Sequence, residues 1–512
     1  MIENLNEVGS DPFSGVKYDV CICGAGVAGI TIAGKLSSKL RVLLLEAGEF
    51  DYTIRSQDVY QGKITGLGYF DLTTTRLRYF GGTSNHWSGW CRPLDAYDFE
   101  RKPYLSTSGW PITRSDLDPY LSEAREILDI PDTPENNILS DNDCVASTLA
   151  ATGQYRSIRF WRSAPTRFGQ KYRDFINQRS SLDCFLNANI TDIVMTDDHS
   201  SISHLEIMDY RGNRYRVSAT TYILAFGGIE NPRILLNANK QNGVGVGNKK
   251  DLVGRFFADH PHHTIGSFIL TDKSRRDIAA NWVDTLAARR FFSPTQEMMH
   301  RDSLLNFGIR FQPNKPVLAY SFKERLKSVI CDHEFTKNLV NDIRGEELTC
   351  YNNENEGILR MSTEQAPNMQ SRITLGQETD KFGLRRLNIN WQLSDIDLYT
   401  IRQAAIGFGE AMAKLDIGRM HVEEWIQDTV TAGSLPGIGE DEVAGHHHMC
   451  TTRMGSNPGE GVVNADQRVF GLDNLYIAGS SVFSSTGHAN PTFTIVQMSL
   501  RLADHINSTL NT

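Results

Sequence analysis

The sequence predicts an α/β fold, α+β over the whole chain, with one doubly wound parallel sheet and a second domain built on an antiparallel sheet. Residues 18–23, 28–40 and 41–45 give a strand, a helix and a strand within about 30 residues, which is the order of a βαβ unit. Residues 221–225 and 474–478 repeat the pattern of a buried strand that ends near glycine. The first domain is therefore expected to be discontinuous along the chain.

The second domain is predicted from its strand-like composition. Between 261 and 440, β-branched and aromatic residues gather at 263–270, 304–312, 357–361 and 387–393. This pattern favours antiparallel strands over helices. The expected organisation places 1–105, 185–260 and 441–512 in the first domain, and 106–184 and 261–440 in the second.

Composition narrows the class of protein. The chain has 512 residues, 40% hydrophobic content and 61 acidic against 52 basic side chains, for a net charge of -9. We expect a small, uncharged partner and no nucleic acid, because no basic run offsets this charge. The start of the chain has no basic and apolar leader, no segment reaches the ~20 apolar residues of a membrane helix, and eight cysteines are scattered. These features predict a cytoplasmic protein that does not enter a membrane.

A glycine motif lies in the first strand-to-helix turn. Gly24, Gly26 and Gly29 form the G-x-G-x-x-G pattern, and Glu46 follows the next strand. The first glycine allows a tight turn, the second lets a pyrophosphate approach the backbone, and the third lets helix and strand pack. Glu46 can accept hydrogen bonds from ribose hydroxyls. The first domain is thus expected to be Rossmann-like and to bind a dinucleotide, which this motif alone does not identify as FAD or NAD.

The C-terminal region holds two further polar motifs. The first runs over residues 446–455 and begins with three consecutive histidines. The second, at 487–492, contains Asn490 and Pro491 before an apolar-periodic run, which predicts a helix start with Asn490 as cap. The positive end of that helix is expected to face an anionic group.

Together these motifs resemble the glucose-methanol-choline (GMC) oxidoreductase family from end to end. The resemblance rests on 24–29 with Glu46, on Gly81-Gly82-Thr83-Ser84, on 225–233 and on the C-terminal motifs. Within the family the sequence is most similar to the branch of pyranose oxidases and glycoside 3-oxidases or dehydrogenases. The resemblance implies FAD as cofactor, and Asp259-His260-Pro261 as the segment that enters the substrate domain. The implied cofactor-binding residues are Gly24, Gly26, Gly29, Glu46, Gly81, Gly82, Thr83, Ser84, His86, Trp87, Ile190, Gly227, Gly479, Ser480, Asn490, Pro491 and Thr492.

The resemblance also implies the catalytic residues. Family members place a histidine four positions before a Thr-x-Arg-Met-Gly element, which gives His447 here as the base, with Asn490 as its partner. A neutral imidazole can take the hydroxyl proton while an amide holds the oxygen, and a positioned base typically contributes ~10² to 10⁴ in rate. His448 and His488 are further candidates for the substrate site, and Asn490 could instead only cap its helix, with His488 in its place.

Two questions about bound groups stay open at this stage. In pyranose oxidases the matching histidine of a similar segment is bonded to the flavin, so His86 could carry FAD covalently or only contact it. Adjacent histidines such as those at 446–448 and 262–263 point in divergent directions, so no metal site is expected.

The expected activity is oxidation of a secondary hydroxyl of a sugar or glycoside, at C2 or C3, to a ketone. A hydride would pass to flavin N5, and oxygen or another acceptor would reoxidise the flavin. Two alternatives stay open: oxidation of a non-sugar alcohol in a biosynthetic pathway, and a lyase that holds FAD without redox change.

Overall fold

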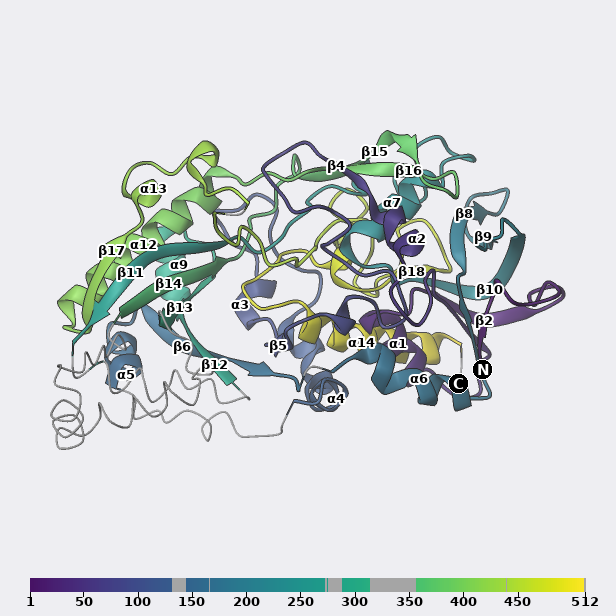
Figure 1. The fold of residues 1–512 in the computed structure, drawn as a ribbon, viewed down its shortest axis with the longest axis horizontal. Helices are drawn as coiled ribbons and strands as arrows, with labels where there is room; N and C mark the ends of the chain where they lie inside the picture. Colours follow the sequence, from purple (N-terminus) through teal and green to yellow (C-terminus); the bar gives the residue numbers. More distant parts are fainter. Residues whose placement is uncertain are drawn as a thin grey trace, which may run out of the picture.

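The structure, a computed structural model, describes residues 1–130, 144–164, 166–271, 274, 288–313, 356–438 and 440–510. Figure 1 shows an elongated molecule with one sheet towards each end and the two chain termini side by side. Two of the eight scattered cysteines, Cys331 and Cys350, lie outside the described residues. Among the described residues, no helix is both long and apolar enough to cross a membrane.

The first sheet is mostly parallel and has the order β1-β7-β3-β2-β10-β9-β8, with β18 paired to β10. Strands β1, β7, β3, β2, β10 and β18 pair in parallel, whereas β9 and β8 are antiparallel additions. Its strands are β1 (Ile2–Asn4), β2 (Lys17–Cys23), β3 (Val42–Leu45), β7 (Leu182–Leu186), β8 (Asn189–Met195), β9 (Ile202–Met208), β10 (Arg214–Leu224) and β18 (Leu475–Ile477). Every residue of β3 is buried, as expected of a central parallel strand covered on both faces.

Helices pack on this sheet and complete the predicted βαβ unit. Helix α1 (Val27–Lys35) joins β2 to β3 and lies beside α14 (Thr492–Thr509), which brings the end of the chain to its beginning (Figure 1). The helix predicted over 28–40 thus ends five residues early, at Lys35. Other helices are α2 (Ile54–Gln57), α3 (Ala96–Phe99), α4 (Leu121–Ile127), α5 (Cys144–Ala150), α6 (Phe168–Gln178) and α7 (Gly227–Asn237).

The second sheet is antiparallel, with the order β17-β11-β14-β13-β12-β6-β5. Its strands are β5 (Trp90–Cys91), β6 (Tyr155–Arg162), β11 (His262–Leu270), β12 (Ala288–Pro294), β13 (Phe307–Pro313), β14 (Glu356–Thr363) and β17 (Gly418–Val422). Helix α12 (Asp395–Lys414) runs along this sheet, with α9 (Gln296–Asp302) and α13 (Glu424–Gln427) nearby (Figure 1). Phe292, Phe311 and Phe408 pack between sheet and helix.

One predicted strand belongs to a different sheet from the one expected. The stretch at 387–393 falls in β16 (Arg385–Asn390), which pairs with β15 (Arg372–Thr379) and β4 (Gly62–Ile64) in a separate three-stranded sheet. Its β4 pairing is parallel and joins residues more than 300 positions apart, a long-range partner that local composition cannot reveal.

The carboxyl ends of the parallel strands meet at one edge of the first sheet. Gly24 follows β2, Glu46 follows β3, Gly227 follows β10 and Gly479 follows β18. In doubly wound folds this edge is where ligands bind.

Candidate active site

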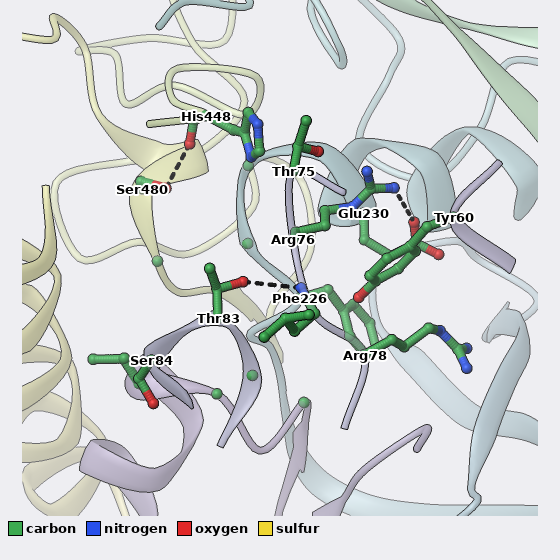
Figure 2. A pocket seen from close by; sticks show the side chains of 18 of the residues that line it. Tyr60, Thr75, Arg76, Arg78, Thr83, Ser84, Phe226, Glu230, His448 and Ser480 are labelled. Carbon is green, nitrogen blue, oxygen red and sulfur yellow. Dashed lines mark hydrogen bonds and ion pairs between the residues drawn. The ribbon is translucent and has the colours of Figure 1, made fainter. Parts of the chain in front are cut away.

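A cavity of about 520 Å³ opens at this edge and extends toward the C-terminal motifs (Figure 2). Most of the residues singled out by the sequence line it, from both ends of the chain. They are Gly24, Gly26, Glu46, Gly82, Thr83, Ser84, His86, Trp87, Ile190, Gly227, Gly479, Ser480, His447, His448, Asn490, Pro491 and Thr492. The strand ends and the C-terminal histidines therefore face one continuous space.

The end of the cavity at the glycine motif has a fixed carboxylate. Glu46 is 6% exposed, and its two oxygens accept hydrogen bonds from Ala25 N and Gly48 N, each at 2.9 Å. Each oxygen keeps a further lone pair for a ligand hydroxyl. Ile190, on β8, lines the same cavity and supplies an apolar surface beside it.

The three glycines of the motif differ in what surrounds them. A Cβ on Gly29 would lie 1.9 Å from the carbonyl oxygen of Gly24, and Gly24 itself has φ +110°, so both are needed for the turn. A Cβ on Gly26 would meet nothing within 4 Å, although the residue lines the cavity. The open space at Gly26 is where a pyrophosphate could approach the backbone.

Buried donors without partners lie in the same cavity. Arg76 is 6% exposed, and its Nε and Nη2 have no hydrogen-bond partner among the described residues. Its nearest carboxylate, Glu230, is 3.7 Å away, beyond hydrogen-bond distance. His448 Nε2 is likewise buried without a partner. Figure 2 shows Arg76 reaching toward Glu230 and Tyr60. The unused N–H groups of Arg76 are therefore able to donate to an acceptor in the cavity, such as phosphate.

The Gly81–Trp87 segment lies on the glycine motif. Gly81 N donates to Ala25 O at 2.8 Å, and a Cβ on Gly82 would lie 3.3 Å from Gly26 Cα. Gly81 itself has φ +92° and does not line the cavity; it shapes the turn instead. Ser84 Oγ donates to Gly81 O at 2.6 Å and holds that turn. The exposed His86 ring faces the cavity from this segment.

His447 is positioned by a short antiparallel pairing between 258–261 and 444–449. Its backbone N donates to Asp259 Oδ1 at 2.8 Å, and its Nδ1 lies 2.9 Å from His260 Nδ1. Burial, and then the neighbouring histidines, lower the pKa of His447 well below its usual value. His447 is therefore a neutral imidazole at neutral pH, which is the form a general base requires.

Asn490 does not cap the helix that follows it. Helix α14 begins at Thr492, and Asn490 Nδ2 instead donates to Trp90 O at 3.1 Å. The expectation of an Asn490 cap is wrong because Pro491, with φ -71° and ψ -20°, already has helical geometry and takes the cap position. The contact with Trp90 fixes the amide while Asn490 still lines the cavity.

His488 lies away from the cavity. It is 2% exposed, its Nε2 lies 3.1 Å from Ser362 Oγ, and it packs on Phe160 and Phe291 of the antiparallel sheet. A Cβ on Gly308 would lie 2.1 Å from His488 Nε2, so the ring fills a space left by that glycine. His488 thus joins the second sheet to the C-terminal segment.

Tyr60, Arg76 and Arg78 line the cavity but were not singled out from the sequence. Glu230, from the 225–233 motif, lines the cavity as well. Asp259 and His260, expected only as part of the segment that enters the substrate domain, support His447 from behind. Arg76 and Arg78 stand shortly before Gly81-Gly82, and this pair of basic residues is the local signal from which their place in the cavity could have been predicted. Among the described residues, no group of three or more His, Cys, Asp or Glu side chains is arranged to hold a metal ion.

Comparison with known proteins gives concordant results. Residues 367–499 match the family model of the GMC oxidoreductases. The chain is 24% identical to 6'''-hydroxyparomomycin C oxidase of Streptomyces lividus, over 96% of this chain and 92% of that protein. It is 25% identical to the fructose dehydrogenase large subunit of Gluconobacter japonicus over 61% of this chain and 51% of that protein, so it spans about half the length of that relative. The structure of pyridoxine 4-oxidase from Mesorbium loti superposes with a TM-score of 0.58 at 15% identity, covering 96% of this chain and 99% of that one.

The cavity lies at the carboxyl ends of the parallel strands, which is where doubly wound folds bind dinucleotides. The chain resembles the GMC oxidoreductases, an FAD-dependent family whose model matches residues 367–499. The residues present fit that cofactor: Gly26 leaves room for the pyrophosphate, Arg76 has free donors for it, and Glu46 can hold the ribose.

Proposed function

We propose that this protein oxidises a secondary hydroxyl of a sugar or glycoside, at C2 or C3, to a ketone, with FAD bound in the cavity. The observation that carries the proposal is that one cavity joins the glycine motif and Glu46 to His447 and Asn490. Bound FAD supplies the acceptor for the hydride that leaves the carbinol carbon. Oxygen or another acceptor then reoxidises it.

The chain's own residues handle the proton and the oxygen. His447 takes the hydroxyl proton, because its pKa is lowered and its ring borders the cavity. Asn490 uses one N–H on Trp90 O, which leaves the second N–H of that amide to hold the alcohol oxygen. His447, from 444–449, and Asn490, just before α14, both line the cavity. In this proposal the alcohol hydroxyl binds between them, so that Asn490 holds its oxygen while His447 takes its proton.

The sugar class rests on two supports. The 81–87 and 489–492 segments resemble the sugar-oxidising branch of the family, and one relative is named for dehydrogenation of fructose. A second relative is named for oxidation of 6'''-hydroxyparomomycin C. The two alternatives, oxidation of a non-sugar alcohol and a lyase activity without redox change, are distinguished by the following experiment.

Anaerobic reduction of the purified holoprotein tests this function. We expect a pyranoside from a panel of sugars, glycosides and simple alcohols to bleach the flavin absorbance near 450 nm, and His447→Ala to slow the bleaching by ~10² to 10⁴. His446→Ala, which removes the neighbouring exposed imidazole, should have a much smaller effect. Bleaching by simple alcohols alone would overturn the sugar class. Turnover without bleaching would indicate a lyase, and equal rates in His447→Ala and wild type would remove His447 as the base.

We also propose that His86 is the residue through which FAD is attached if the attachment is covalent. Its exposed ring lines the cavity directly after the turn that covers Gly26. Denaturation of the holoprotein gives the test: yellow colour that stays with the polypeptide, and is released in His86→Ala, supports the bond. Colour that separates from wild type excludes it.

A further inference from the structure

The ring behind His447 has an environment that fixes where its own proton lies. His260 is 1% exposed, and its Nε2 lies 3.0 Å from Gly487 O and 3.4 Å from Thr486 O. Both of these neighbours are carbonyl oxygens, which can only accept hydrogen bonds. The proton of a neutral His260 must therefore lie on Nε2, which leaves Nδ1 as an acceptor.

This assignment determines the tautomer of His447 as well. The only hydrogen bond that joins the two rings is between their Nδ1 atoms, which are 2.9 Å apart. Because His260 Nδ1 accepts, His447 Nδ1 must carry the proton and donate. The lone pair of His447 is then on Nε2, the nitrogen that the contact with His260 does not use, on a residue that lines the cavity.

We propose that His260 is a positioning residue that holds the proton of His447 on Nδ1, so that Nε2 is the atom that takes the proton from the alcohol. The proposal rests on the proposed function, in which His447 is the base. When the alcohol O–H bond breaks, its proton forms a new bond to His447 Nε2. His260 keeps its own proton and accepts a stronger, charge-assisted hydrogen bond from the resulting imidazolium.

The charge state of His260 agrees with this role. Burial lowers the pKa of His260 to about 4, so it is neutral over the whole range in which the enzyme is expected to work. A protonated His260 would donate from Nδ1 and force His447 into the opposite tautomer. The other titratable groups that face this pair are Asp259, His262, His446, His448 and His488.

Asp259 keeps the two rings in register. Its Oδ1 accepts hydrogen bonds from the backbone N of His260 at 2.7 Å and of His447 at 2.8 Å. Its Oδ2 accepts from Tyr69 OH at 2.5 Å, so the carboxylate itself is held. Asp259 thus fixes the two backbone positions from which the rings of His260 and His447 meet.

Two replacements of His260 test the contributions of its two ring nitrogens separately. In His260→Asn the amide oxygen can occupy the place of Nδ1 and accept from His447, whereas in His260→Gln the amide reaches the place of Nε2 and leaves His447 Nδ1 without its acceptor. We expect His260→Gln to slow flavin reduction by about 10- to 100-fold with little change in KM, and His260→Asn to stay within about threefold of wild type.

The pH profile distinguishes positioning from damage to the fold. Without the Nδ1 acceptor the imidazolium of His447 is less stable, so in His260→Gln the acidic limb of the rate profile should move to lower pH. A merely loosened site would admit water and raise the pKa of His447 toward its usual value, which moves that limb the other way. FAD content and thermal unfolding of each holoprotein variant control for folding.

A double-mutant cycle completes the test. In a His447→Ala background, His260→Gln should have no further effect on flavin reduction, because its partner is gone. Equal losses in His260→Asn and His260→Gln, or additive losses in the cycle, would overturn the role of His260. If His447→Ala alone has no effect, the proposed function fails instead.

Discussion

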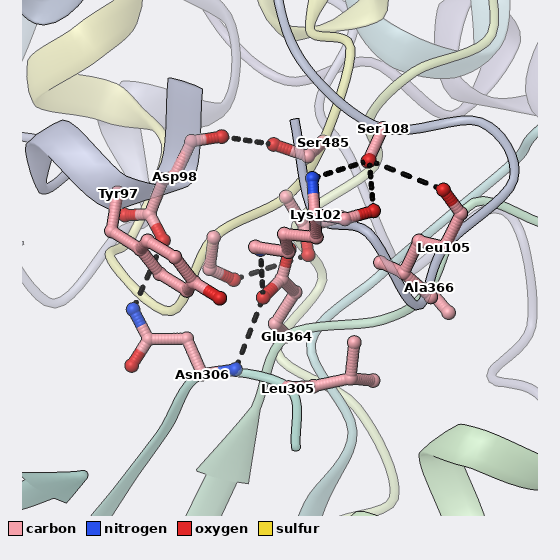
Figure 3. A network of polar contacts seen from close by, with 12 residues as sticks. Tyr97, Asp98, Lys102, Leu105, Ser108, Leu305, Asn306, Glu364, Ala366 and Ser485 are labelled. Atoms are coloured by element: carbon pink, nitrogen blue, oxygen red, sulfur yellow. Dashed lines mark hydrogen bonds and ion pairs between the residues drawn. The ribbon is translucent and has the colours of Figure 1, made fainter. Parts of the chain in front are cut away.

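Two buried polar clusters in this molecule differ in how completely their hydrogen bonds are made. In the first, Lys102 Nζ donates to both oxygens of Glu364 at 2.6 and 2.7 Å, and Asn306 N donates to the same carboxylate at 3.1 Å (Figure 3). Asn306 Nδ2 in turn donates to Asp98 Oδ1 at 3.0 Å. The second cluster lines the cavity, and there Arg76, Glu230 and His448 all keep buried atoms without partners.

The difference indicates which cluster is structural and which awaits a ligand. Lys102 and Glu364 are 1% and 0% exposed, and no side-chain atom of Lys102, Glu364, Asn306 or Asp98 is buried without a partner. A complete network of this kind fixes one geometry and needs nothing further. The cavity cluster is equally buried but incomplete, which is unfavourable unless a bound group supplies the missing partners.

The largest effect is expected from breaking the complete cluster. Lys102→Met leaves the Glu364 carboxylate buried without its cation, which should lower the free energy of unfolding by about 3–5 kcal/mol. Urea unfolding of the apoprotein and the holoprotein should show the same loss, because the cluster does not line the cavity.

The double variant Lys102→Met/Glu364→Gln is the matched control. It removes both charges but keeps an oxygen for Asn306 N, so most of the lost stability should return. A double variant as unstable as Lys102→Met would show that the charge pair is not what the cluster contributes.

Breaking the incomplete cluster should act on cofactor binding instead. Arg76→Met removes two donors, Nε and Nη2, that the apoprotein does not use, and one, Nη1, that donates to Leu72 O at 3.0 Å. The free energy of unfolding of the apoprotein should therefore fall by only about 1 kcal/mol. FAD affinity should weaken by about 1.5–3 kcal/mol, or roughly 10- to 150-fold, if Arg76 makes a charge-assisted bond to the pyrophosphate. Flavin fluorescence during reconstitution of the apoprotein measures this constant.

Arg78→Met is the control for Arg76→Met, because Arg78 lines the same cavity but already has hydrogen-bond partners. Arg78 already donates to Asn189 Oδ1 at 2.8 Å and Tyr210 OH at 3.0 Å, so its loss should destabilise the apoprotein. An Arg76→Met apoprotein that unfolds as easily as Arg78→Met would show that Arg76 is structural too.

The sequence predicted the parts of this site that are local. The strand, helix and strand around Gly24 to Glu46 are confirmed, because their signals lie within one short segment. His447 and Asn490 could be chosen from motifs, and both line the cavity, but their roles stay predictions. The contact between His260 and His447 joins residues 187 positions apart and depends on a strand pairing that neither segment encodes alone. The environment of Arg76 is equally non-local.

His263 extends the comparison of the two clusters, because its ring nitrogens have no hydrogen-bond partner in the part of the chain that the structure describes and yet it does not line the cavity. It is 2% exposed on β11, packs on Trp425 with ring centroids 5.2 Å apart, and neither ring nitrogen has a hydrogen-bond partner among the described residues. Burial lowers its pKa to about 4. Between that value and the unfolded value near 6.5, the unfolded chain binds a proton that the folded chain does not, so stability rises with pH through this window and falls on acidification.

We therefore expect His263 to contribute about 2 kcal/mol of destabilisation as the pH falls from 7 to 5. His263→Phe keeps an aromatic ring against Trp425 and removes the titrating group, so urea unfolding of this apoprotein should lose about that much of its pH dependence. His421→Phe, on the exposed side of β17, controls for an added phenyl ring. Because His263 does not line the cavity, adding FAD should leave its contribution unchanged. The same ligand should stabilise a protein with Arg76 intact more than Arg76→Met. A pH dependence that survives in His263→Phe would place the acid sensitivity on the cavity histidines instead.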